Sequence, residues 1–144
     1  MSPEKLLRFV TAREIGAEES PWGTREPLCR PAFTAAQRLY MVRMNMPPGQ
    51  AHPFHRHPEM EEIIYVLSGT AEQWVDRESR ILGAGELAHV PQDVVHGTYN
   101  IGSDTLVFLA ILSPARSEGP ATVDVSMDPP WVSLKPGAAD SPDA

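Results

Sequence analysis

Short apolar stretches, separated by breaks rich in glycine and proline, fill the middle of the chain. Residues 63–67 form a run of five apolar residues rich in β-formers, and the run predicts a strand that is covered on both faces. Breaks at 47–49, 68–69 and 83–85 divide this part of the chain into segments of strand length. The predicted strands are 38–46, 61–67, 70–76, 86–90, 94–100 and 105–112. Their spacing favours an all-β fold, an antiparallel sandwich or barrel.

The two ends of the chain lack this strand pattern. We expect an N-terminal extension (1–36), a β-barrel domain (37–113), a C-terminal extension packing on the barrel (114–134) and a disordered tail (135–144). The first ten residues fit a short helix, and residues 8–15 fit a strand equally well. In the C-terminal extension, 122–126 fit an edge strand, and Trp131 and Val132 fit a docking segment.

Composition narrows the class of protein. A chain of 144 residues with 42% hydrophobic residues suits one domain with a real core. Twelve basic against nineteen acidic residues give a net charge of −7, which argues against a nucleic-acid partner. No apolar run approaches the roughly 18 residues of a membrane span, so no membrane partner is expected. The single Cys29 cannot form an internal disulfide, which predicts a reducing, cytoplasmic location.

All the histidines fall in one stretch of the chain. They are His52, His55, His57, His89 and His96. Side chains two apart on a strand share a face, so His55 and His57 lie side by side while Arg56 points away. Glu62 and His96 stand on the following predicted strands. If these faces meet inside one barrel, three imidazoles and a carboxylate converge. They suit one divalent transition metal (Fe, Mn, Ni, Zn, Co or Cu), and four ligands leave coordination positions on the metal open for a substrate.

Two motifs in this region resemble those of the cupin superfamily. The first is Gly49, five residues, His55-x-His57, four residues, Glu62, six residues and Gly69. The second runs from Gly85 through Pro91 and His96 to Asn100. Nine of the ten fixed positions match; Asp93 stands where the family usually has glycine.

The resemblance covers about residues 38–112 and implies a double-stranded β-barrel, or jelly roll. It also implies a metal bound by a His₃Glu cluster, defined as His55, His57, Glu62 and His96. The six-residue spacing to Gly69 selects Glu62 over Glu61 as the ligand. Asp tolerates a positive φ, so we expect the turn at Asp93 to survive and the metal to remain.

Two further residues are candidate catalytic groups. His52, in the segment after Gly49, is interpreted either as an exposed loop histidine or as a proton shuttle at the barrel mouth. Tyr40 shares a predicted strand face with Val42, Met44 and Met46, and we interpret the two methionines as barrel packing rather than soft metal ligands. Arg43 and Arg56 are the only basic residues expected near the mouth, which gives weak support for binding a small anion.

These features predict a small metal-dependent enzyme acting on a small organic molecule, with the metal as Lewis acid or O₂-activating centre. Dioxygenase-type chemistry is favoured, because an open His₃Glu site suits co-ordination of substrate and O₂. Isomerase, lyase or decarboxylase activity is an alternative within the family. A non-catalytic module that binds a metal and a small ligand is the alternative from another class. A homodimer is expected, because pairing would cover the 63–67 strand and the exposed barrel edges.

Overall fold

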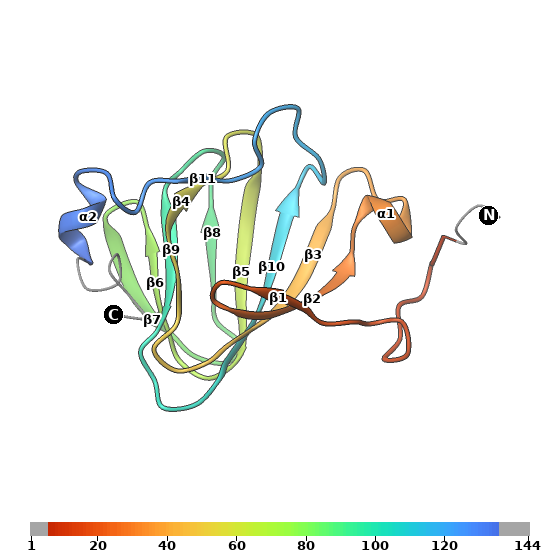
Figure 1. The fold of residues 1–144 in the computed structure, drawn as a ribbon, viewed down its shortest axis with the longest axis horizontal. Coiled ribbons are helices and arrows are strands. Elements are labelled where there is room, and N and C mark those ends of the chain that lie inside the picture. The colour runs from red at the N-terminus through yellow and green to blue at the C-terminus, as the bar shows by residue number, and fades with distance from the viewer. Residues whose placement is uncertain (1–5, 136–144) are drawn as a thin grey trace.

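Two antiparallel sheets face each other in the computed structural model, which describes residues 6–135 (Figure 1). In spatial order, the six-stranded sheet holds β1 (Glu18–Ser20), β2 (Gly23–Cys29), β3 (Tyr40–Met46), β10 (Leu106–Ser113), β5 (Glu61–Ser68) and β8 (Leu87–Val90). The five-stranded sheet holds β11 (Val123–Asp124), β4 (Ala51–Arg56), β9 (His96–Asn100), β6 (Ala71–Val75) and β7 (Glu78–Leu82). The helices α1 (Pro31–Thr34) and α2 (Trp131–Leu134) are single turns. The predicted all-β jelly roll is confirmed, as two sheets that do not close into a continuous barrel.

The main core lies between the two sheets and follows strand alternation. On β10 every second residue is buried, and on β3 the buried positions are Val42, Met44 and Met46. The packing role predicted for Met44 and Met46 is therefore confirmed. Arg43 faces the other way, where its Nε donates to Glu26 Oε1 at 2.9 Å. Neither helix of the described residues is long or apolar enough to cross a membrane.

Several local expectations differ from the structure. His52, expected in a loop after Gly49, lies in strand β4, and β7 was not predicted at all. Residues 8–15 form turns and irregular chain rather than a strand. The expectation that both faces of the 63–67 strand are covered is wrong for the single chain. Ile64 and Val66 are buried on the inner face of the sheet, whereas Leu67 is 40% exposed on the outer face.

The chain on either side of 37–113 adds strands to both sheets. At the N-terminal end, β2 pairs with β3 and extends the six-stranded sheet. At the C-terminal end, β11 pairs with β4, which confirms the edge strand. Trp131 packs on Phe54 with ring centroids 5.3 Å apart, which confirms the docking segment. Of the helix expected in the first ten residues, 6–10 are described and are not helical, and 1–5 lie outside the described residues. The expected disordered tail lies outside them except for Lys135.

Candidate metal centre

The His₃Glu cluster is assembled from both sheets. His55 on β4 and His96 on β9 are cross-strand partners in the five-stranded sheet, and His57 follows the end of β4. Glu62 comes from β5 of the six-stranded sheet. All four side chains are buried, and one ligand atom from each lies within 4.8 Å of the others. The structure therefore brings together the four predicted residues, and the cluster fits a single divalent metal ion.

Each imidazole is oriented by a backbone carbonyl. The Nδ1 atoms face Pro53 O at 2.7 Å for His55, Ala121 O at 2.8 Å for His57 and Val94 O at 3.0 Å for His96. A carbonyl only accepts, so each Nδ1 carries a proton. In a neutral ring the Nε2 lone pair is then free, which is the arrangement that metal-binding histidines need.

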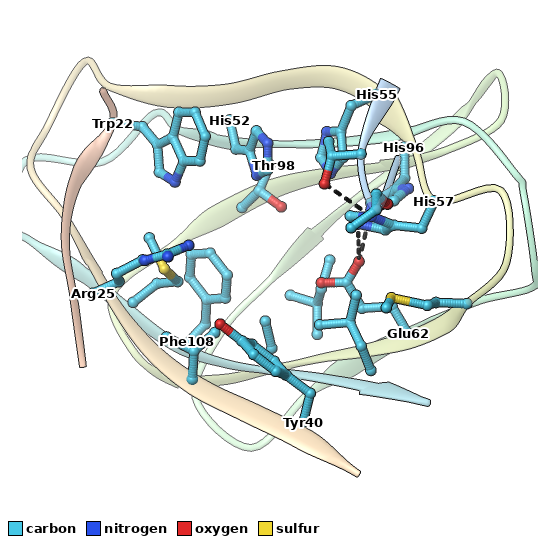
Figure 2. A pocket seen from close by; sticks show the side chains of 18 of the residues that line it. Trp22, Arg25, Tyr40, His52, His55, His57, Glu62, His96, Thr98 and Phe108 are labelled. Carbon is cyan, nitrogen blue, oxygen red and sulfur yellow. Dashed lines mark hydrogen bonds and ion pairs between the residues drawn. The ribbon is translucent and has the colours of Figure 1, made fainter. Parts of the chain in front are cut away.

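The Nε2 atoms meet the Glu62 carboxylate. Glu62 Oε1 lies 2.8 Å from His96 Nε2 and 3.0 Å from His57 Nε2 (Figure 2). Since an unprotonated Nε2 and a carboxylate oxygen are both acceptors, contacts this short require a positive charge between them. A proton or a metal ion supplies it, so the donor set fits a cation at this point.

The pKa values of the cluster follow from burial and from these contacts. Burial alone would raise the pKa of Glu62, but the charge on His96 and the hydrogen bonds from His57 and His96 outweigh it and lower that pKa. Burial would lower the pKa of His57, but the bond to Glu62 raises it overall. Burial is the main reason why the pKa of His55 falls well below its usual value. Glu62 is therefore held as a carboxylate, the form that binds a metal.

The cluster lies at one end of a cavity of about 400 Å³ between the sheets. That volume is in the range of small-molecule sites. Apolar side chains line most of it, among them Val42, Met60, Ile64, Phe108 and Leu112. The Tyr40 hydroxyl points into the cavity (Figure 2).

His52 is not the exposed loop residue of the first interpretation. It sits on β4, lines the cavity and is stacked between two rings. Its ring centroid is 3.8 Å from that of Trp22 and 3.6 Å from that of His55. Burial lowers its pKa well below the usual value, so the ring is neutral near pH 7. The stack places His52 directly beside a ligand ring.

Sequence reasoning missed the other end of the cavity. Trp22 and Arg25, which belong to the β1–β2 hairpin, line that end (Figure 2). Arg43 and Arg56, the basic residues expected near the mouth, do not line the cavity, and Arg56 Nη1 instead pairs with Asp93 Oδ1 at 2.8 Å. The only local signal was an aromatic and a basic residue in a segment without a clear strand pattern.

The neighbours of the ligands agree with the motif spacing. Glu61, the alternative to Glu62, turns outward and contacts His89 Nε2 at 2.8 Å. Asp93 has φ of +65°, the left-handed conformation expected at the family's glycine position. Its backbone N–H donates to His57 O at 3.0 Å, so the turn closes against the first motif.

A family model described as the cupin domain matches residues 42–112, which include the whole His₃Glu cluster. The chain belongs to the cupin superfamily. This cupin is 29% identical over 126 residues to Polyketide synthase CurC of Streptomyces cyaneus, covering 88% of the chain and 81% of the relative. It is 32% identical over 89 residues to Germin-like protein 3-8 of Oryza sativa subsp. japonica, covering 56% of the chain but only 37% of that protein.

Among solved structures, KdgF from Halomonas sp. superposes on this cupin with a TM-score of 0.66. The match covers 76% of this chain and 96% of that one, at 24% identity. At that identity the likeness concerns the fold. These findings together show a cupin with a buried cluster that fits a metal, and they leave its reaction to be proposed.

Proposed function

We propose that this cupin is a metal-dependent enzyme that acts on a small organic molecule, with dioxygenase-type chemistry. The observation that carries the proposal is the set of three carbonyl-oriented imidazoles beside the Glu62 carboxylate at the wall of a mostly apolar cavity. His55, His57, Glu62 and His96 would hold a metal by four donors and would leave coordination positions free for substrate.

A bound divalent metal supplies Lewis acidity and, if it is redox-active, the ability to activate O₂. The chain itself binds the substrate, keeps bulk water out and handles protons. The apolar wall of Val42, Ile64 and Phe108 favours an apolar or aromatic body. His52 and Tyr40 are the groups outside the ligand set that we assign to proton transfer, because both line the cavity. The Streptomyces relative, which matches 88% of this chain, is named a polyketide synthase, and this supports an oxygen-bearing organic substrate.

We also propose that the protein is a cytoplasmic homodimer. The dimer is supported by the outer face of the six-stranded sheet, where Leu67 and Leu87 are 40% and 49% exposed beside the half-buried Ile63 and Tyr65. Pairing of two such faces would remove apolar surface from water. The cytoplasmic location is supported by the free Cys29.

The test is elemental analysis of natively purified protein beside the His96→Ala variant. About one Fe, Mn or Ni per chain, lost in the variant, supports the proposal and is followed by measurement of O₂ consumption with candidate substrates. Zinc alone would redirect the proposal to an isomerase, lyase or decarboxylase. No metal after reconstitution would contradict it and leave a ligand-binding module.

A further inference from the structure

Strand register places Arg25 on the inner face of the six-stranded sheet. Arg25 on β2 pairs with Met44 on β3, and Met44 pairs with Phe108 on β10. Cross-strand partners point to the same side of a sheet. Met44 and Phe108 are buried between the sheets and line the cavity, so Arg25 faces the cavity as well.

The same register separates Arg25 from the metal ligands. Glu62 pairs with Leu112, and Leu112 pairs with Tyr40, so Glu62 lies in the Tyr40 row. Met44 follows Tyr40 by four residues, which puts the two rows about 13 Å apart along the strands. The row between them holds only apolar side chains, Val42, Ala110 and Ile64. Figure 2 shows Arg25 and the His₃Glu cluster at opposite ends of the cavity.

Arg25 also places positive charge that is not fully neutralised at its end of the cavity. Its Nε donates to Glu18 Oε1 at 3.3 Å, but the other oxygen of Glu18 accepts from Arg30 Nη2 at 3.1 Å. One carboxylate therefore faces two guanidinium groups. Within residues 6–135 the Nη atoms of Arg25 take part in no hydrogen bond, and they are the atoms that bind a planar anion in a fork.

We propose that Arg25 binds a carboxylate at the end of the substrate that is remote from the metal. Resting on the proposed function, this defines the substrate class as a small aromatic or apolar molecule with metal-chelating oxygens at one end and a carboxylate at the other. Arg25 is then a specificity-determining residue. It tells acidic substrates from their neutral analogues and takes no part in the chemistry at the metal.

The test compares two probes that differ in one group. Dihydrocaffeate carries a chelating catechol and a carboxylate, and propylcatechol has a methyl group in place of that carboxylate. Both are titrated calorimetrically, without oxygen, into Co²⁺-loaded protein. The proteins are the wild type, Arg25→Gln, Arg25→Lys and Arg80→Gln. The last is a matched control, because Arg80 is 74% exposed and lies outside the cavity.

We expect the wild type and Arg80→Gln to prefer dihydrocaffeate about tenfold, the size of a charge-assisted contact at a partly exposed guanidinium. Arg25→Gln should bind both probes equally while its affinity for propylcatechol stays unchanged, which also shows that the cavity is intact. Arg25→Lys should keep only part of the preference. An equal preference in the wild type and Arg25→Gln, or none in the wild type, overturns the assignment.

A metal-free titration separates this inference from the proposed function. If both probes bind equally well with and without Co²⁺, metal chelation of the substrate is wrong, whereas the Arg25 assignment is still decided by the ratio of the two affinities. If binding requires Co²⁺ and the ratio depends on Arg25, both proposals are supported.

Discussion

The two ends of the cavity are built in different ways. At the metal end, four buried side chains come from both sheets and lie within the two motifs, and a backbone carbonyl orients each of the three imidazoles. At the other end, Trp22 and the 39%-exposed Arg25 come from a hairpin that precedes the matched cupin region. The metal end lies within the matched cupin region, whereas the hairpin end lies outside it. Changes in the hairpin can therefore alter the cavity wall while the four ligands stay in place.

Removing a ligand should have the largest effect and should be confined to the metal end. His57→Ala is expected to lower the metal content from about one ion per chain to below about a tenth, because it removes one of four donors. The far-ultraviolet circular dichroism should remain that of a β protein, since the two-sheet core does not depend on this ring. Elemental analysis of dialysed protein measures the first effect. Full occupancy in the variant would contradict the ligand assignment.

Acidification should have the second-largest effect, a loss of affinity for the metal. Metal binding needs neutral His57, whose pKa is raised above 6.5 by Glu62, so affinity should fall up to about tenfold per pH unit below that raised value. Conversely, the stability that the protonated His57 gives the metal-free protein is complete below pH 6.5 and lost as the pH rises through the raised pKa. The rise in Tm caused by Co²⁺ should therefore grow from pH 6 to pH 8. A rise that is constant with pH would show that His57 releases no proton on binding.

A pair of tryptophans separates ligand binding from stability. Trp22→Ala should weaken propylcatechol binding about tenfold, because it removes the cavity wall and the stack on His52, while the metal content stays the same. Trp131→Ala should affect stability and not binding. It should lower the free energy of unfolding by about 2 kcal/mol through lost packing on Phe54 and leave binding unchanged. Calorimetry and urea unfolding measure the two effects, and equal losses of binding would argue against a distinct hairpin end.

The smallest effect is expected at Asp93. Asp93→Gly relieves a left-handed backbone but loses an exposed ion pair with Arg56 and adds freedom to the unfolded chain. These contributions oppose each other, so the free energy of unfolding should change by less than about 1 kcal/mol, with metal retained. Urea unfolding and metal analysis check this. A large loss of metal would show that the aspartate side chain, through its ion pair with Arg56, helps to position the ligands.

The metal end could be predicted because its information is local. Strand alternation puts His55 and His57 on one face, and the resemblance to the first cupin motif, with its fixed spacing to Gly69, separates Glu62 from Glu61. The structure agrees at each of these points, since Glu62 joins the cluster and Glu61 turns to His89. Asp93 likewise adopts the positive φ that its place in the motif predicts.

The hairpin end of the cavity depends on how β2 pairs with β3, and this register cannot be predicted from the local sequence pattern of either strand. Arg25 faces the cavity only because β2 pairs with β3 in a register that sets it beside Met44. His52 was misplaced for a related reason. Pro53 cannot donate to a neighbouring strand, so the segment looks like a loop, whereas the structure absorbs it in a register shift between His52 and His55.

The carbonyl that orients His57 has a consequence for how variants of this cupin should be interpreted. Two of the three orienting carbonyls come from two residues earlier in the chain, but that of Ala121 lies 64 residues away. Because the contact uses the backbone, the side chain at position 121 can change without breaking it. An alanine scan would therefore pass over a contact that ties one ligand to the path of the C-terminal segment. Deletions or insertions between 113 and 123 would disturb it, so length rather than composition is the constrained property of that segment.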